Sequence, residues 1–141
     1  MLPDLKNERL NCMIEIKKCD TLAGLEDFGF DLYPTSVIMA AKDKDEILGA
    51  GEIISCDGYA ILGRIYVKEE YRGMMLEHSI AKALLNMADL GGIKYIVCDM
   101  EDDALAKRLR MISGEEGKDI VPIAQRYKYF LCLEGYFTAH C

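Results

Sequence analysis

The chain has 141 residues, of which 51% are hydrophobic, and its formal net charge is -7 at pH 7. This length suffices for one hydrophobic core and is short for two, so we expect a single domain over residues 1–141. Binding to phosphate backbones needs clustered lysines and arginines, and the acidic balance therefore argues against a nucleic-acid partner. No segment approaches the roughly 20 apolar residues of a membrane span, so we expect no membrane partner.

The six cysteines are scattered along the chain without a C-x-x-C pair. The N-terminal stretch has no apolar run after its basic residues and hence no signal peptide, which predicts a reducing, cytoplasmic environment. Cys56, Cys98 and Cys132 lie in apolar, strand-like stretches, where a thiol packs as a small hydrophobic group. We therefore expect buried structural thiols. The pattern shows no metal-ligand spacing, so no metal site is predicted.

The first half of the chain predicts a strand, a weak helix and an antiparallel meander. Residues 12–18 alternate like a half-buried strand, and residues 21–30 read as a glycine-interrupted helix that ends near Tyr33-Pro34. Three strands are expected next, at Val37–Ala41, Ile47–Cys56 and Tyr59–Val67. Asp57-Gly58 between two apolar runs is a two-residue hairpin signal, which makes the last two strands antiparallel neighbours.

After Val67 the hydrophobic period changes from two residues to about 3.6, which indicates an amphipathic helix. The residues on its apolar face are Leu76, Ile80, Ala83, Leu84, Met87 and Ala88. Gly91-Gly92 ends this helix, and a near-continuous apolar strand follows at Ile93–Asp99. A strand, a helix and a strand within some thirty residues form a crossover, so these two strands should be parallel or splayed neighbours.

The last third predicts a second helix in residues 102–112, with acids at its start and bases at its end. Residues 114–119 read as a loop. Strands are expected at Arg126–Leu133 and from Tyr136 to the end, joined by a hairpin at Glu134-Gly135. The fold class is therefore α+β: one mixed, mostly antiparallel sheet with a central parallel or splayed strand pair and helices on both faces.

This order of elements, together with "VKEEYRG" at residues 67–73 and the helix that follows, resembles the GNAT family of N-acetyltransferases. The similarity covers about residues 37–111. It implies that acetyl-CoA is the acyl donor and that the backbone of Ile65, Tyr66 and Val67 pairs with its pantetheine arm. The family loop Arg/Gln-x-x-Gly-x-Gly/Ala, which holds the pyrophosphate at a helix start, corresponds to Arg72 and the residues after it.

Several residues depart from that loop pattern. With Arg72 at the first position, Gly73 and Met74 come next, Met75 takes the first glycine position, and Glu77 takes the second, after Leu76. Met75 adds bulk and Glu77 adds a negative charge where phosphate should approach. Two interpretations of the neighbouring His78 stay open: it donates to a phosphate, or it is merely exposed.

Aminolysis of a thioester needs a base for the amine proton and an acid for the leaving thiolate. The tyrosine that family members often supply from the second helix is replaced here by Arg108. Glu52 on the meander could face the cleft as the base, or it could be solvated. Tyr129 on the closing hairpin is the candidate acid, with Tyr127 and Tyr136 as further hydroxyl donors, or all three are ordinary strand aromatics.

The resemblance thus implies an acyl-CoA-dependent N-acyltransferase that acts by direct attack of a small-molecule or peptide amine. The alternative is a non-enzymatic GNAT-fold binding or regulatory module that has lost efficient CoA binding. The segment between the first strand and Pro34 is short for the two helices that wall the family's acceptor site, which weakens any assignment of the acceptor. Self-association as a homodimer is left open.

Overall fold

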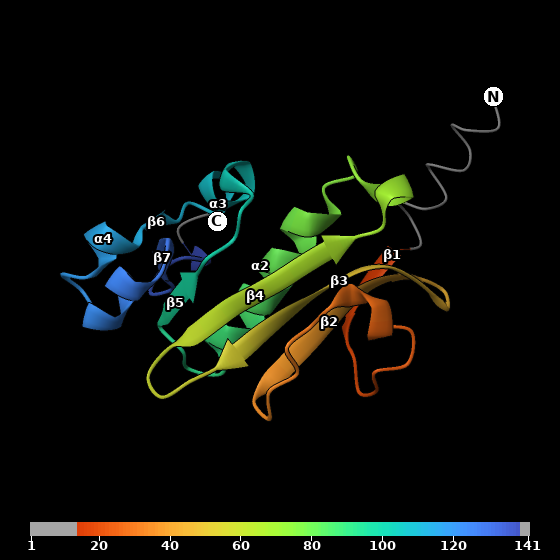
Figure 1. Ribbon diagram of the computed structural model, residues 1–141, viewed down its shortest axis with the longest axis horizontal. Coiled ribbons are helices and arrows are strands. Elements are labelled where there is room, and N and C mark those ends of the chain that lie inside the picture. Colours follow the sequence, from red (N-terminus) through yellow and green to blue (C-terminus); the bar gives the residue numbers. More distant parts are fainter. Residues whose placement is uncertain (1–13, 139–141) are drawn as a thin grey trace.

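The computed structural model describes residues 14–138, and Figure 1 shows how their elements are arranged. Seven strands form one sheet in the order β1-β2-β3-β4-β5-β7-β6, in which only β4 and β5 are parallel. The strands are β1 (Ile14–Lys18), β2 (Ser36–Asp43), β3 (Glu46–Ser55), β4 (Ala60–Val67), β5 (Tyr95–Cys98), β6 (Ile112–Ser113) and β7 (Tyr129–Cys132). The α+β class and the central parallel pair are confirmed.

The helices are few and mostly short. The α-helices are α2 (Leu76–Leu90), α3 (Asp103–Arg108) and α4 (Gly114–Gly117), and the 3-10 helices are η1 (Glu26–Phe28), η2 (Glu69–Tyr71) and η3 (Pro122–Arg126). The predicted amphipathic helix is confirmed as α2, and it ends directly before Gly91-Gly92, as expected. At its C-terminus Gly92 adopts φ 85°, a left-handed conformation that glycine reaches without steric cost.

The predicted meander of β2, β3 and β4 is also confirmed. The Asp57-Gly58 hairpin joins β3 to β4, with the Cys56 N–H donating to the Tyr59 carbonyl at 2.8 Å. Between β3 and β4 the pairing is irregular, because Gly51 pairs with Ile65 while Ile53 pairs with Leu62. Two residues of β4 therefore oppose Glu52 alone, which is a β-bulge in the middle of the sheet.

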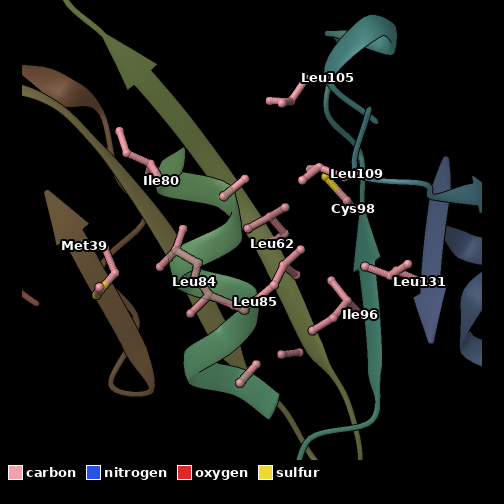
Figure 2. Packing of buried hydrophobic residues seen from close by; sticks show 14 of the residues in the cluster. Met39, Leu62, Ile80, Leu84, Leu85, Ile96, Cys98, Leu105, Leu109 and Leu131 are labelled. Carbon is pink, nitrogen blue, oxygen red and sulfur yellow. The ribbon is translucent and has the colours of Figure 1, made fainter. Parts of the chain in front are cut away.

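The main core lies between α2 and one face of the sheet, and Figure 2 shows this cluster with α2 in the middle. The buried residues of α2 are Leu76, Ile80, Ala81, Leu84, Leu85 and Ala88. Ala81 and Leu85 thus take the buried positions that the sequence assigned to Ala83 and Met87, which are partly buried at the edge of the cluster. This rotates the buried stripe slightly around the helix without changing its length.

The opposite face of the sheet is covered by the 3-10 segments. Phe28 of η1 packs with Ile38 and Ala50, and Ala124 of η3 packs with Val97 and Phe130. Both faces are therefore covered, as expected, but only one carries a long helix. The predicted helix at residues 21–30 is wrong, since only η1 forms there. Glycine conformations explain the break: Gly24 and Gly29 both have positive φ, at 83° and 73°.

In the C-terminal third, the predicted helix at residues 102–112 forms only as α3, since Ile112 pairs with Phe130 in β6, and two further expectations are wrong. Residues 114–119 do not form a loop, because α4 occupies Gly114–Gly117 with the Ser113 hydroxyl accepting from the Glu116 N–H at 3.1 Å. Gly117 lies directly under Phe130, whose ring would be 2.5 Å from a Cβ at that position. These glycines thus permit close packing of a helix rather than marking a loop.

The predicted closing hairpin is also wrong. β7 begins only at Tyr129, because η3 extends to Arg126, and residues 134–137 form a turn and no strand. Tyr136 instead enters the main core, where its hydroxyl donates to the Leu109 carbonyl at 2.9 Å. β7 pairs with β5 and with the two-residue strand β6. The sequence patterns did not predict β6. Residues 139–141 of the predicted last strand lie outside the described residues.

The cysteines within residues 14–138 are free thiols. Cys98 is fully buried, as expected, and burial raises the pKa of its thiol to about 11. The expectation of buried thiols is wrong for Cys56 and Cys132, which are half-buried like Cys19, whereas Cys12 and Cys141 lie outside the described residues. Among the helices of residues 14–138, none combines the length and the apolar character that crossing a bilayer demands.

Candidate functional site

A cavity of about 740 Å³ opens where β4 and β5 diverge. The two strands pair only at Ala60–Ile96 and Ile61–Val97, and beyond these pairs they separate toward α3 (Figure 1). The cavity is bordered by Ile61–Ile65 of β4 on one side and by Asp99–Asp102, directly after β5, on the other. Because the β5 ladder stops at Ile61, the backbone edge of β4 beyond it is free to pair with a ligand.

The backbone segment expected to hold the pantetheine arm lies along this edge. Ile65 and Val67 line the cavity, whereas Tyr66 is not among the lining residues. The Tyr66 ring packs on the opposite face of the sheet, 5.2 Å from the ring centroid of Phe28. The alternation of side chains along β4 explains this split, since neighbouring residues point to opposite faces.

Arg72 lies at one end of the cavity and folds back onto β4. Its Nε donates to the Val67 carbonyl at 3.2 Å, and its guanidinium carbon lies 5.7 Å from the Tyr66 ring centroid. These contacts fix the side chain while its other guanidinium N–H groups stay available to an anion. The structure thus places Arg72 where a phosphate binder is expected.

The turn between Arg72 and α2 is built from left-handed backbone. Gly73 has φ 89° and Met75 has φ 64°, and α2 begins at Leu76 with the Ser79 N–H donating to the Met75 carbonyl at 3.1 Å. No side chain caps this helix start. The N–H groups of the first turn have no partner within the helix, and such a terminus attracts anions.

The side chains that depart from the family pattern lie in different places. Met75 is 46% exposed and does not line the cavity, and its sulfur accepts from Nη1 of Arg108 at 3.4 Å. Met74 packs against the main core, while Glu77 lines the cavity. His78 is half-buried outside the lining, and burial, followed by the charges of nearby basic side chains, lowers its pKa. Met75 therefore leaves the helix start open, whereas Glu77 adds a negative charge there.

The charged residues around the cavity are unevenly divided. Its lining holds two arginines and five acids: Arg64, Arg72, Asp31, Glu77, Asp99, Glu101 and Asp102. Asp102 caps α3 by accepting from the Leu105 N–H at 3.0 Å, and Asp99 accepts from the Lys128 N–H at 2.8 Å. The β5 side is thus acidic, while both arginines belong to the β4 side.

The two candidate catalytic residues lie outside the cavity lining. Glu52 is fully buried on the interior strand β3 and is neither solvated nor among the lining residues. The Tyr129 hydroxyl donates to Asp103, which also forms an ion pair with Lys128 at 2.8 Å. The hydrogen bond to Asp103 raises the Tyr129 pKa, which favours its neutral form. The structure does not bring Glu52 and Tyr129 together.

Sequence reasoning did not identify the acids Asp31, Asp99 and Glu101 or the base Arg64 as cavity residues. A signal was present for part of this set, because the acidic run Asp99–Asp103 follows directly on a buried strand. The position of Asp31 depends on contacts with distant β3, which no local pattern reveals. Within residues 14–138, no group of three or more His, Cys, Asp or Glu side chains is placed to hold a metal ion.

Comparison with known proteins identifies the family. The sequence profile of the acetyltransferase (GNAT) family matches residues 2–110. The chain therefore belongs to the acetyltransferase (GNAT) family, whose members transfer acyl groups from acyl-CoA to amines, and the acyltransferase interpretation of the sequence is supported. No curated protein sequence matches the chain.

Solved structures share the fold at low sequence identity. A candidate acetyltransferase from Exiguobacterium sp. 255-15 is 14% identical over 90% of this chain and 97% of its own, with a TM-score of 0.64. A GNAT family N-acetyltransferase from Escherichia coli in complex with CoA is 14% identical over 74% and 71%, with a TM-score of 0.63. The ribosomal-protein-S18-alanine N-acetyltransferase from Escherichia coli is 13% identical over 72% and 79%, with a TM-score of 0.62.

Proposed function

We propose that this chain transfers the acetyl group of acetyl-CoA to a primary amine inside the cavity between β4 and β5. The observation that carries the proposal is the separation of these strands after two residue pairs, with the uncapped start of α2 at the same cavity. A free strand edge supplies hydrogen bonds for an extended arm, and a helix start supplies them for an anion. CoA combines both features in one molecule.

Arg72 and the backbone amides of residues 73–78 would hold the pyrophosphate. Arg72 is fixed against Val67 and Tyr66, so little side-chain freedom would be lost when it binds. Glu77 opposes this binding, because its carboxylate lines the same cavity. We infer that the backbone amides and Arg72 outweigh this single, half-exposed charge.

The backbone of β4 from Leu62 to Val67 would pair with the pantetheine arm, and the bulge opposite Glu52 would place the thioester. A bulge leaves backbone groups out of the ladder, and an N–H at this point can polarise the thioester carbonyl. The amine then attacks the carbonyl carbon, the C–S bond breaks, and the acetyl group passes to nitrogen. Polarisation of the carbonyl is thus assigned to the strand and not to a side chain.

Proton transfer would proceed through water. Asp31 and Asp99 lie on opposite sides of the cavity lining. Their carboxylates could accept the amine proton through a water molecule. Arg108, which occupies the place of the family's tyrosine, donates to the Met75 sulfur and has no hydroxyl group to supply the proton. Water is therefore the proposed proton donor to the leaving thiolate.

Isothermal titration with acetyl-CoA and with CoA tests the donor half of this proposal. We expect both to bind, and Arg72→Ala to weaken both, while Arg126→Ala at the exposed end of η3 serves as a matched control. The release of CoA is then followed with a panel of amines: a polyamine, a peptide with a free N-terminus and an aminoglycoside. No heat and no thermal shift at millimolar acetyl-CoA would favour the non-enzymatic module.

The proposed setting is a reducing, cytoplasmic compartment, which the free thiols within residues 14–138 support. The acceptor is proposed to be a small molecule or a peptide with a free amine. Self-association as a homodimer stays a prediction, and light scattering coupled to size-exclusion chromatography measures it directly.

A further inference from the structure

Glu52 is the one charged side chain that is buried among residues 14–138. Its Oε1 accepts from the Asp31 N–H at 3.0 Å, and its Oε2 accepts from the Leu32 N–H at 2.8 Å and from the Ser36 hydroxyl at 2.5 Å. All three partners act as donors, and the two oxygens of Glu52 accept from every one of them. A buried carboxylate persists where such donors replace its water.

The three partners belong to one short segment, residues 31–36, which leads from η1 to β2. Leu32 in this segment has φ 58°, a left-handed conformation that bulky residues avoid unless their surroundings impose it. The Leu32 side chain is 45% exposed, so its own packing does not impose this conformation. The carboxylate of Glu52 bonds the two backbone amides at this point, whereas Thr35 and Ser36 are also held by the bonds and pairing of β2 with β3.

The same carboxylate lies next to the floor of the cavity. Glu52 sits opposite the bulge formed by Gly63 and Arg64, and a Cβ on Gly63 would lie 3.5 Å from Glu52 Oε1. Gly63 and Arg64 line the cavity, and so does Asp31 from the segment that Glu52 holds. Glu52 thus lies behind two parts of the cavity wall, the β4 bulge and Asp31, and is not itself a lining residue.

We propose that Glu52 is a positioning residue, which holds residues 31–32 at the cavity beside the β4 bulge so that Asp31 binds the ammonium form of the acceptor amine. This inference rests on the proposed function and specifies its acceptor as a cationic amine. A carboxylate at the cavity edge attracts an ammonium group and selects against neutral or anionic acceptors. Glu52 itself neither contacts the substrate nor takes its proton.

Amide hydrogen exchange measured by NMR tests the positioning step without any ligand. We expect the Asp31 and Leu32 amides to exchange about 100-fold slower than in an unstructured peptide, because each is bonded to a buried acceptor. In Glu52→Gln one oxygen becomes an NH2 group that cannot accept, so at least one of the two amides should exchange at least about tenfold faster. Ser36→Ala is the matched control, since it removes a partner of Glu52 and leaves both amide bonds intact.

Steady-state kinetics with the best amine of the panel tests the functional step. We expect Glu52→Gln and Asp31→Asn to raise the KM for that amine about tenfold, the scale of one lost charge-assisted contact, while the KM for acetyl-CoA changes less than about twofold. Substitution of a residue needed only for stability would not raise the KM for the amine while leaving the KM for acetyl-CoA unchanged. Asp31 is exposed, so Asp31→Asn should fold even if Glu52→Gln does not.

Two results would overturn the inference. One is rapid exchange of the Asp31 and Leu32 amides in the unmodified chain, or unchanged exchange in folded Glu52→Gln. The other is an equal loss of acetyl-CoA and amine binding in Asp31→Asn. If the unmodified chain fails to bind acetyl-CoA, the proposed function and its acceptor fall together, while the exchange data still decide whether Glu52 holds the segment.

Discussion

Two segments border the cavity, and they are held in opposite ways. Residues 31–36 give three hydrogen bonds to one buried side chain, Glu52, and their last residue also pairs in the β2–β3 ladder. Residues 72–77 form the start of α2 without any side-chain cap, and Met75 is largely exposed. Both segments contain a bulky residue with left-handed backbone, Leu32 at φ 58° and Met75 at φ 64°.

This difference explains why the helix start can carry methionine and glutamate where family members have glycine. The anion-binding groups proposed for it are backbone N–H groups, which any residue supplies, and the Met75 sulfur bonds to Arg108 while Met75 is absent from the cavity lining. The segment that bonds to Glu52 is less tolerant, because the Asp31 and Leu32 amides both bond to this one carboxylate. Substitutions should therefore affect stability strongly at Glu52 and weakly at Met75.

The largest effect is expected for Glu52→Leu. Three donors lose their acceptor, each worth about 1.5–3 kcal/mol when bonded to a charge, and burial of leucine offsets part of the loss. We expect the free energy of unfolding to fall by about 2–4 kcal/mol in urea titrations. Met75→Leu, the matched change in the other segment, should alter it by less than about 0.5 kcal/mol. Equal effects at the two positions would contradict the distinction between the segments.

Arg72→Ala should have the next largest effect, and on binding instead of folding. Loss of a charge-assisted contact with the pyrophosphate should weaken CoA binding by about 1–3 kcal/mol, measured by calorimetry. Arg126→Ala should leave the dissociation constant unchanged. If Arg72→Ala bound CoA like the unmodified chain, the guanidinium would not face the ligand, and the proposed phosphate site would be misplaced.

Glu77→Gln should strengthen CoA binding. Removing one negative charge from the cavity lining should improve the binding free energy by about 0.5–1 kcal/mol at low ionic strength, because the group is partly solvated. The gain should shrink as salt is raised toward 0.5 M, since salt screens the repulsion. A loss of affinity on this substitution would mean that Glu77 contacts the ligand favourably.

The smallest effect is expected for Met75→Gly. The sign of the change in the free energy of unfolding shows whether Met75 lies before α2 or inside it. Glycine adopts φ 64° without the cost of about 1–2 kcal/mol that other residues incur, but it also has more freedom in the unfolded chain. We expect a net stabilisation of roughly 0.5 kcal/mol in thermal unfolding. A loss of about 1 kcal/mol, as for glycine inside a helix, would place Met75 within α2 and close the turn that precedes it.

The parts of the fold that sequence predicted well are those with local, periodic signals. The meander, the long helix and its Gly91-Gly92 terminus follow from side-chain alternation, a 3.6-residue period and glycine chemistry. The parts that failed are those that tertiary contacts decide. Gly117 reads as a loop residue, but it forms a helical turn because Phe130 packs onto it.

The candidate site also contains residues with a local sequence signal and residues whose positions depend on tertiary contacts. Arg72 and the helix start could be placed from a contiguous motif, and the structure puts both at the cavity. Glu52 was selected as a residue near the chemistry, but alternation along β3 could not show that its carboxylate is enclosed by residues 31–36. Such a contact joins positions about 20 residues apart and leaves no periodic trace in the sequence.

The short pairing of β4 with β5 also has a mechanical consequence. Two residue pairs join the ribbon β1–β4 to the ribbon β5–β7–β6, and both pairs lie at one end of the cavity. Widening the angle between the ribbons would therefore break no ladder hydrogen bond beyond Ile61. Resistance to such bending comes from the apolar cluster under α2, which contains residues of both ribbons. The stiffness of the cavity is thus set by side-chain packing, and shortening Leu85 or Ile96 would soften it without unpairing a strand.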